Sequence, residues 1–254
     1  MSSVGIFAST KTRETPLELL CRMDSSVSDS LFSDDLGTVN INTSTDGGSV
    51  RIWKSVSGSI DNYNWKTTGG SVVYNRNKFK SNMPCIDCYE GSMLHSHPVT
   101  FAPTDGHTIC VVYKLDFSDG RVEWHANAGS IGHVFFTRTG TAYEWSYLWR
   151  TFRIDNTFQT NIHELPGRIT SQYFWKPSEP LVYIGTFDAK KRRAKMYLNS
   201  ASNVIADSPY MPPSTISFSG DGLIFQIAEA RLYKGTMSED RLELEMNELV
   251  TKWV

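Results

Sequence analysis

The sequence has 254 residues, a length that fits one large domain or two small ones. Its 25 Lys and Arg residues nearly balance its 27 Asp and Glu residues, and the formal net charge of −2 argues against a general nucleic-acid-binding protein. No apolar run is long enough for a membrane-spanning helix. Aromatic residues reach 12% while charged residues stay at 20%, a balance that favours β-structure over helix.

The N-terminal segment differs in composition from the rest of the chain. Residues 1–36 are rich in Ser and acidic side chains, and residues 16–23 are predicted to form a short helix. The first ten residues have neither the positive start nor the sustained apolar stretch of a removable signal peptide. We therefore expect residues 1–36 to form an arm that leads into a single domain over residues 37–254.

Beyond residue 40, short β-type runs alternate with clusters of Gly, Asn, Asp, Ser and Pro, a spacing typical of a β-sandwich. The clearest unit is a hairpin whose strands cover residues 181–187 and 194–199 on either side of a polar turn. The other predicted strands cover residues 49–53, 71–75, 108–117, 132–138, 142–152 and 222–233.

The chain is predicted to end in a helix. Ser238 can cap its N-terminus, and the acidic residues Glu239 and Asp240 suit its first turn because of the helix dipole. The carboxylates between residues 243 and 248 are expected to form a solvated face of this helix. The helix also carries one apolar stripe that can pack on the sandwich, made of Leu242, Met246, Leu249 and Trp253.

The end of the chain, residues 222–242, resembles the closing strand and helix of concanavalin A-like, laminin-G-type jelly rolls. Residues 196–199 look like that family's Tyr-Val-Asn-Gly hairpin, with Ser200 in place of the usual Gly. The resemblance implies an all-β fold, a two-sheet antiparallel jelly-roll sandwich, here with a short N-terminal arm and a C-terminal helix. Four upstream segments follow the family's order, at residues 50–53, 57–58, 82–84 and 107–113.

The strand predicted over residues 142–152 contains the first set of candidate binding residues. If its aromatic face is exposed, it is a platform for stacking sugars or a strip for contacting a protein. If that face points to the opposing sheet, the same side chains are core, and the sequence leaves both interpretations open. Strand alternation places four aromatic side chains on this face, Tyr143, Trp145, Tyr147 and Trp149.

The turn of the predicted hairpin contains the second set. It concentrates four positive charges at a loop tip, at Lys190, Lys191, Arg192 and Arg193. A solvated turn explains these charges, and so does a contact with an acidic partner or an anionic glycan. A nuclear-localisation signal is a third interpretation.

No catalytic residue is predicted. Retaining glucanases of the resembled family share a Glu-x-Asp-x-(x)-Glu strand, whose carboxylates lie about 5–5.5 Å apart across the sugar bond, and the sequence has no such strand. The six histidines are scattered along the chain, and no Ser or Cys has the glycine pattern of a nucleophile elbow.

No metal or cofactor is predicted either, although calcium is left open. Cys85 and Cys88 with His95 and His97 match the ligand count of a zinc site, but the two cysteines lie in a predicted strand, where residues three apart point to opposite faces. Together with Cys21 and Cys110 they are expected to be buried thiols. Relatives of the scaffold hold calcium in rim loops, where this chain has acidic residues to which we assign no ligand role, Asp61, Asp116, Asp119 and Asp221.

These observations lead us to expect a non-catalytic structural or attachment module that binds a glycan or a protein surface. Laminin-G-like single domains occur among phage virion proteins, so the first expectation is a virion-surface protein, either a capsid decoration or a fibre. Such a protein is made in the host cytoplasm, docks onto other virion proteins through residues 1–36, and is free to form homo-oligomers. The alternatives are a cytoplasmic or extracellular lectin, and a carbohydrate-active hydrolase or lyase.

Overall fold

The computed structural model describes the backbone of residues 16–80, 82–88, 93–97, 99–102, 104–115, 132–139, 144–152, 157–161, 170–174, 179–208, 215–216, 218–221 and 225–254, and the side chains of residues 16–80, 82–88, 94–97, 99–102, 104–114, 179–204 and 226–254. The elements in chain order are β1 (Glu18–Asp24), η1 (Ser28–Ser30), β2 (Leu31–Phe32), β3 (Gly48–Ser49), β4 (Ile52–Lys54), β5 (Asn64–Gly69), β6 (Val72–Lys80), β7 (Met83–Cys88), β8 (Met93–Ser96), β9 (Val99–Thr100), β10 (His107–Leu115), β11 (Gly132–Thr139), β12 (Glu144–Phe152), β13 (Thr157–Asn161), β14 (Thr170–Phe174), β15 (Leu181–Asp188), β16 (Arg193–Leu198), β17 (Val204–Ser208), β18 (Thr215–Ile216), β19 (Phe218–Asp221), β20 (Phe225–Lys234) and α2 (Glu239–Trp253).

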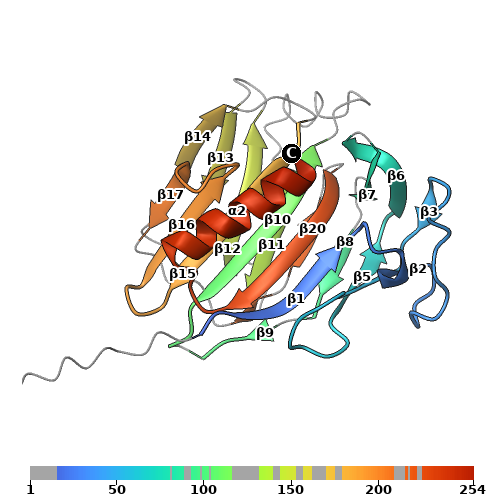
Figure 1. Ribbon diagram of the computed structural model, residues 1–254, viewed down its shortest axis with the longest axis horizontal. Helices are drawn as coiled ribbons and strands as arrows, with labels where there is room; N and C mark the ends of the chain where they lie inside the picture. Colours follow the sequence, from blue (N-terminus) through green and yellow to red (C-terminus); the bar gives the residue numbers. More distant parts are fainter. Residues whose placement is uncertain are drawn as a thin grey trace, which may run out of the picture.

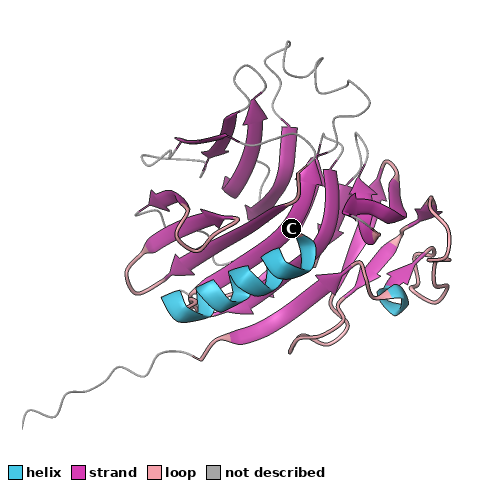
Figure 2. Cartoon of the chain, turned by 45° about the horizontal axis from the view of Figure 1, so that its top comes forward, coloured by secondary structure: helices cyan, strands magenta, loops and turns pink. Residues whose placement is uncertain are grey.

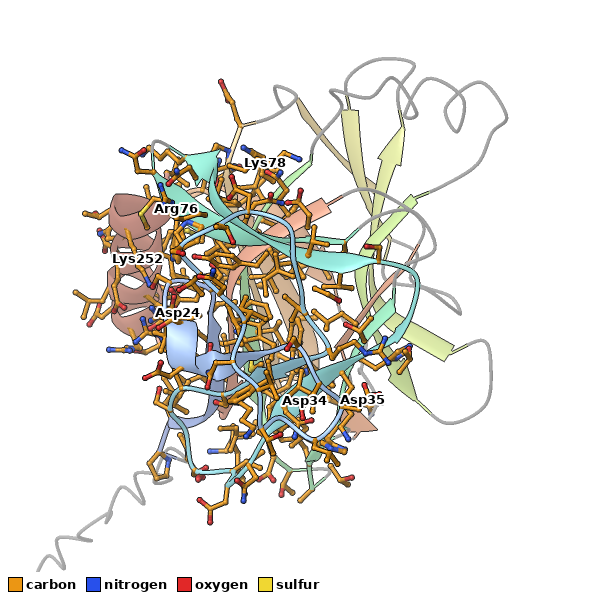
Figure 3. All side chains as sticks on the ribbon, turned by 90° about the vertical axis from the view of Figure 1, so that its right-hand side faces the viewer. Asp24, Asp34, Asp35, Arg76, Lys78 and Lys252 are labelled. Atoms are coloured by element: carbon orange, nitrogen blue, oxygen red, sulfur yellow. The ribbon has the colours of Figure 1, made fainter. Side chains whose placement is uncertain are left out.

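Two layers of antiparallel strands face each other (Figure 1 and Figure 2). One layer is a nine-stranded sheet in the order β17-β16-β15-β10-β20-β7-β6-β3, with β1 beside β20. The other layer combines a five-stranded sheet, β14-β13-β12-β11-β19, with a four-stranded sheet, β2-β4-β5-β8, and the two meet where β19 approaches β8. The helix α2 lies on the far side of the nine-stranded sheet from the five-stranded sheet (Figure 3). The chain is therefore a β-sandwich with a C-terminal helix, as predicted.

A bulge at Ala228 changes both the facing and the neighbour of β20. On the β10 side Tyr113 pairs with Ile227 but Val112 pairs with Glu229, so Ala228 is an extra residue in the ladder. On its other edge β20 pairs with β7 before the bulge and with β1 after it. Because of the extra residue, Glu229 joins Ala228 on the face that α2 covers.

The main hydrophobic core fills the space between the two layers. The nine-stranded sheet contributes large buried side chains such as Tyr113 and Tyr183, and the four-stranded sheet contributes Trp53 and Trp65. The two tryptophan rings meet edge to face, with centroids 5.6 Å apart. This core buries eight of the aromatic side chains in the described part of the chain.

The C-terminal helix buries a second, smaller core on the outer face of the nine-stranded sheet. The Ser238 side chain accepts a hydrogen bond from the Arg241 amide at 3.3 Å and so caps the helix as predicted. The predicted apolar stripe is buried in full. It packs against sheet residues that include Val112, Val182 and Ile184.

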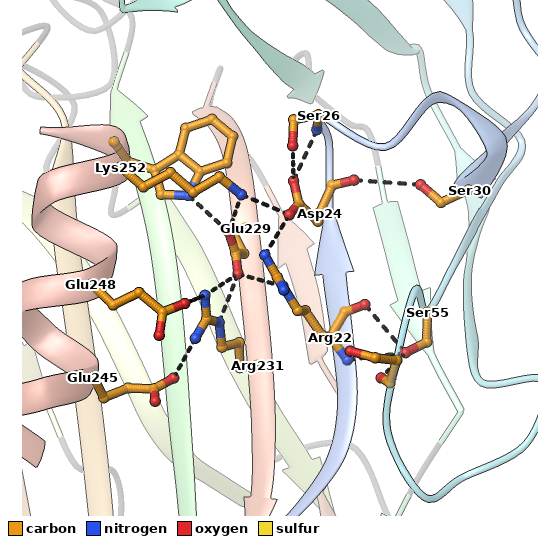
Figure 4. Close-up of polar contacts among 12 residues, drawn as sticks. Arg22, Asp24, Ser26, Ser30, Ser55, Glu229, Arg231, Glu245, Glu248 and Lys252 are labelled. Atoms are coloured by element: carbon orange, nitrogen blue, oxygen red, sulfur yellow. Dashed lines mark hydrogen bonds and ion pairs between the residues drawn. The ribbon is translucent and has the colours of Figure 1, made fainter. Parts of the chain in front are cut away.

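A network of charges ties α2 to the sheet beneath it (Figure 4). Arg231 on β20 lies at its centre and contacts Glu229 at 2.6 Å, Glu245 at 2.9 Å and Glu248 at 2.6 Å. Burial alone would lower the pKa of Arg231, but its hydrogen bonds and charge interactions with these glutamates raise it above its usual range. The guanidinium therefore stays charged beneath the helix.

The same network holds β1 beside β20. Arg22 contacts Glu229 at 2.9 Å and Asp24 at 2.8 Å, and Lys252 near the end of α2 contacts Glu229 and Asp24 at 2.8 and 2.7 Å. The Trp253 indole N–H also donates to Glu229 at 2.8 Å. Burial raises the pKa of Asp24, but hydrogen bonds from Lys252 and Ser26 outweigh it and lower the pKa. Three separate elements thus share one set of buried charges.

The helix predicted at residues 16–23 is wrong, because this segment is the strand β1. It pairs antiparallel with β20, from Glu18 opposite Lys234 to Asp24 opposite Glu229. Cys21 and Met23 point into the main core, while Arg22 points to the charge network on the other face. The two-residue alternation of β1 satisfies both faces of the sheet at once, which outweighs the helical preference of its Leu residues.

The boundary expected at residue 36 also needs correction. The segment 18–32 contributes β1 to the nine-stranded sheet and β2 to the four-stranded sheet, where β2 pairs with β4. These residues are parts of the sandwich, so deleting residues 1–36 would remove buried core instead of a separable arm. Residues 1–15 lie outside the described residues.

The solvated face expected for the helix carboxylates is wrong at Glu245. This side chain is wholly buried and accepts hydrogen bonds from Arg231 and from the Tyr233 hydroxyl, the latter at 2.5 Å. Glu243 is exposed, and Glu248 is half exposed but paired with Arg231. Glu245 can be buried because its carboxylate is paired, with Arg231 and Tyr233 of β20 and with Arg241 of its own helix.

The remaining strand predictions are confirmed within the described residues, except that one predicted strand is divided into two. The hairpin is β15 and β16, paired from Asp188 opposite Arg193 to Tyr183 opposite Leu198. The single strand expected over residues 49–53 is two short strands, β3 and β4, in different sheets. Within the described part of the chain, no helix is both long and apolar enough to cross a membrane.

The charge network predicts a strong dependence of stability on Arg231. We expect Arg231→Met to lower the free energy of unfolding by about 3–5 kcal/mol, because it removes the one buried cation that the buried carboxylates of Glu229 and Glu245 share. Urea denaturation followed by circular dichroism measures this loss. Arg51→Met is the control, since it breaks the exposed pair with Asp35 and should cost less than about 1 kcal/mol. Equal losses for the two variants would contradict the account.

Candidate functional site

The aromatic strand predicted from the sequence is present as β12. It lies in the five-stranded sheet between β11 and β13, with Trp149 opposite Thr160 and Trp145 opposite Arg138. Tyr143 lies outside the described residues, and so do the side chains of Trp145, Tyr147 and Trp149. Their role as a binding ladder stays a prediction.

The basic turn is a described, exposed surface at the tip of the β15–β16 hairpin (Figure 1). The Asp188 carboxylate organises it, because its Oδ1 accepts hydrogen bonds from the amides of Lys190 and Lys191, each at 3.0 Å. Arg192 has a φ of 52°, in the left-handed region that lets the chain reverse direction here. All four predicted cations, at residues 190–193, are exposed.

The charge of this turn is one-sided. Asp188 is the only acidic residue between positions 188 and 193. Its Oδ2 lies 3.4 Å from Nζ of Lys191, whose side chain remains 78% exposed. Such a pair in water contributes little energy and leaves the cation available to a ligand. The turn therefore presents excess positive charge on a backbone that is already ordered.

The base of the hairpin is held firmly against the end of β20. The Thr236 hydroxyl donates to the carbonyl oxygen of Phe187 at 2.8 Å, and the Gly235 amide donates to the carbonyl of Gly106 at 2.6 Å. A Cβ atom at Gly106 would lie 2.2 Å from Thr236 Oγ1, so only glycine fits this close contact. Hydrogen bonds thus fix the base of the hairpin to the end of β20, and a loop that is already ordered can bind without reorganisation.

The cysteines lie as the sequence predicts. All four are buried and free of disulfides, and burial raises the pKa of Cys21 to about 12. Cys85 faces the helix side of the nine-stranded sheet whereas Cys88 faces the main core, so the two cannot share a metal ion. Among the described residues, no group of three or more His, Cys, Asp or Glu side chains could hold a metal.

Calcium stays untested. Asp61 is exposed in a turn. It belongs to no group of three or more possible metal ligands among the described residues. Asp116 and Asp119 lie outside the described residues, and so does the side chain of Asp221.

Sequence reasoning missed the residue that shapes the turn. The binding prediction rested on the four cations of the turn, whereas the hydrogen bonds place Asp188 at its centre. An Asp side chain that accepts hydrogen bonds from backbone amides two and three residues later is typical of an Asx-type turn. In the sequence only Ala189 separates Asp188 from the cationic run, so this signal was present.

At the sequence level, no protein-family model and no curated protein matches the chain. Solved structures match its fold at low identity. Domain 4 of AbnA, a GH43 extracellular arabinanase from Geobacillus stearothermophilus solved in complex with arabinotriose, matches with a TM-score of 0.51 and 13% identity over 91% of this chain and 99% of that domain. The botulinum neurotoxin serotype G binding domain matches with a TM-score of 0.54 and 9% identity over 76% of this chain and 47% of that structure.

A third match is Trypanosoma rangeli sialidase in complex with sialic acid, with a TM-score of 0.55 and 8% identity over 91% of this chain. The chain spans about a third of that sialidase and about half of the neurotoxin structure. These similarities show a shared β-sandwich fold, of the kind found in carbohydrate-binding domains and in parts of glycoside hydrolases.

A buried histidine behind the turn yields a prediction about pH. His107 is stacked on Phe101 at 5.1 Å and tilted against Phe187 at 5.3 Å, and its burial lowers its pKa from 6.5 to about 3. As the pH falls below 6.5, the imidazole of His107 takes up a proton in the unfolded chain but stays neutral in the folded chain. Stability therefore drops, by about 2 kcal/mol at pH 5 from this group.

An NMR titration of the imidazole measures this directly. We expect the His107 resonances to stay those of a neutral ring down to pH 5. A midpoint between pH 6 and 7 in the folded protein would contradict the described packing.

Proposed function

We propose that the chain is a non-catalytic glycan-binding module whose basic turn contacts acidic sugars. The observation that carries the proposal is the match over nearly the full length of both chains with a domain solved in complex with arabinotriose. That match pairs this chain with one complete domain, whereas the sialidase match covers a third of a larger protein.

The chemistry of the turn supports binding over catalysis. Both carboxylate oxygens of Asp188 are engaged, Oδ1 by two backbone amides and Oδ2 by Lys191. A general acid or base must instead be free to exchange a proton with the substrate. Lys and Arg side chains on an ordered loop suit a different task, the attraction and orientation of an anionic group.

The preference for acidic glycans follows from the excess positive charge. Arginine can hold a carboxylate or sulfate with two parallel hydrogen bonds, and lysine adds a mobile point charge. Arg192 and Lys190 are both exposed on the hairpin tip. A sialidase among the structural neighbours was solved with sialic acid, an acidic sugar.

The position on a virion surface stays a prediction of the family resemblance. The comparisons name sugar-processing enzymes and a toxin binding domain, and they supply no further support for a virion partner, a host or a location. The hydrolase or lyase alternative likewise remains as an outcome of the experiment below.

The proposal predicts binding to sialylated or sulfated oligosaccharides on a glycan array. We expect the double variant Lys190→Ser, Arg192→Ser to bind about tenfold more weakly, because two exposed charge contacts of roughly 0.5–1 kcal/mol each are lost. The affinity should also fall as salt concentration rises. Lys66→Ser with Arg76→Ser is the charge-matched control on other exposed residues, and it should leave binding unchanged.

Other outcomes would show which part of the proposed function is wrong. Binding that survives in the turn variant but disappears in Trp145→Ala, Trp149→Ala would move the site to β12. Release of product from any bound glycan would overturn the non-catalytic assignment, and the absence of binding to any glycan would overturn the function itself.

A further inference from the structure

A row of polar side chains crosses the helix-covered face of the nine-stranded sheet beyond the end of α2. In the strand register, Gln226 on β20 stands directly between Asp87 on β7 and Lys114 on β10. The flanking residues Cys85 and Ala228 belong to the small core under α2, which confirms that this row lies on the same face. Three polar neighbours in the middle of a sheet are unusual, because this position normally buries apolar residues.

Two amide side chains on this face, one in the row and one beside it, have unfilled hydrogen-bonding capacity. Gln226 is wholly buried, and neither its Oε1 nor its Nε2 has a hydrogen-bond partner. Nδ2 of Asn75, on the neighbouring strand β6 opposite Cys85, is buried and unpartnered as well. Leaving such a group unpaired costs about 1–3 kcal/mol, so each one calls for an explanation.

The charged members of the row are already engaged. Asp87 is wholly buried, with its Oδ2 at 2.8 Å from Nζ of Lys78 and its Oδ1 accepting a hydrogen bond from the Cys85 thiol at 3.3 Å. Nζ of Lys114 donates to the carbonyl oxygens of Lys78 and Phe79, at 2.6 and 2.7 Å. The unfilled capacity is therefore neutral, two amide donors and one amide acceptor.

A bulge of β6 closes over this row. Asn75 pairs with Cys85 and Lys80 pairs with Met83, so residues 76–79 stand opposite a single residue of β7 and fold outward. The bulge is anchored to the end of α2, because Phe79 meets Trp253 edge to face at 5.6 Å and Lys80 donates to the carbonyl oxygen of Val254.

Lys78 links the buried row to the solvent. Its side chain is 40% exposed although its ammonium group holds the buried Asp87. Figure 3 shows Lys78 on this strand, at the opposite end of the molecule from Asp34 and Asp35. Binding at this row would require the Lys78 side chain to move, because its ammonium group is paired with the buried Asp87.

We propose that Gln226 and Asn75 form a second binding site, which takes a hydroxyl-bearing group of a neutral sugar. A hydroxyl can accept from an amide N–H and donate to an amide oxygen, which matches the unfilled atoms. A cation is disfavoured by Lys78 and Lys114, and an anion is disfavoured by Asp87. Carboxylate and carboxamide side chains together supply the hydrogen bonds that a sugar diol needs.

This site is separate from the basic turn. Lys114 and His107 lie at opposite ends of β10, and the turn adjoins the His107 end through Phe187. The two residues are seven positions apart along the strand, about 24 Å at ~3.4 Å per residue. The inference therefore goes beyond the proposed function, and either one can fail alone.

The test measures binding of neutral pentoses and hexoses, namely arabinose, xylose, galactose and glucose, to the full chain by isothermal titration calorimetry and saturation-transfer NMR. We expect at least one sugar to bind, and Gln226→Met to weaken that binding at least tenfold while the protein stays folded. Asn75→Leu, beside the row, is the second variant. If Gln226→Met does not fold, Asn75→Leu should still weaken the binding of the same sugar. The turn variant Lys190→Ser, Arg192→Ser should keep this binding and lose only acidic glycans.

Two results would overturn the proposal. One is a wild-type protein that binds none of the four sugars, which would mean that water alone satisfies the amides. The other is a Gln226→Met variant with a higher melting temperature and unchanged sugar affinity, which would mean that the amide is merely an unsatisfied group.

Discussion

The bulge at Ala228 is the constraint on which the rest of the structure depends. One extra residue places Glu229 on the outer face of β20, at the point where the strand exchanges β7 for β1 as its neighbour. Before the bulge this face carries Gln226 and the polar row, and after it the face carries Arg231 and the charge network. A regular strand would turn Glu229 toward the apolar core, where no cation could balance it.

The buried charges give α2 a fixed position instead of a merely favourable one. The Arg231 guanidinium contacts Glu229 of the sheet and Glu245 of the helix together, and this shared contact is specific to one register of α2 on the sheet. That register sets where the helix ends, and its last residues hold the β6 bulge through Trp253 and Val254. The fixed helix thereby determines how the polar row is covered, while the basic turn is ordered locally by Asp188.

Local patterns in the sequence predicted the elements whose signals are local. The cap at Ser238, the hairpin at 181–199 and the cationic turn all follow from neighbouring residues. β1 was missed because its partner strand lies more than two hundred positions away and its Leu-rich composition favours a helix in isolation. Glu245 and Gln226 were missed for the same reason, since their surroundings come from other elements. Asp87 between two buried cysteines was a readable signal, a charged residue in an apolar strand.

In the proposed function, the β-sandwich binds sugars at its rim, while its buried charges serve its structure. A crystal structure of the chain grown with a sialylated or sulfated oligosaccharide tests this claim most directly. We predict an intact glycan whose anionic group lies within hydrogen-bond distance of Arg192 or Lys190. An anionic group bound away from the hairpin tip, or a glycan found cleaved, would contradict the account.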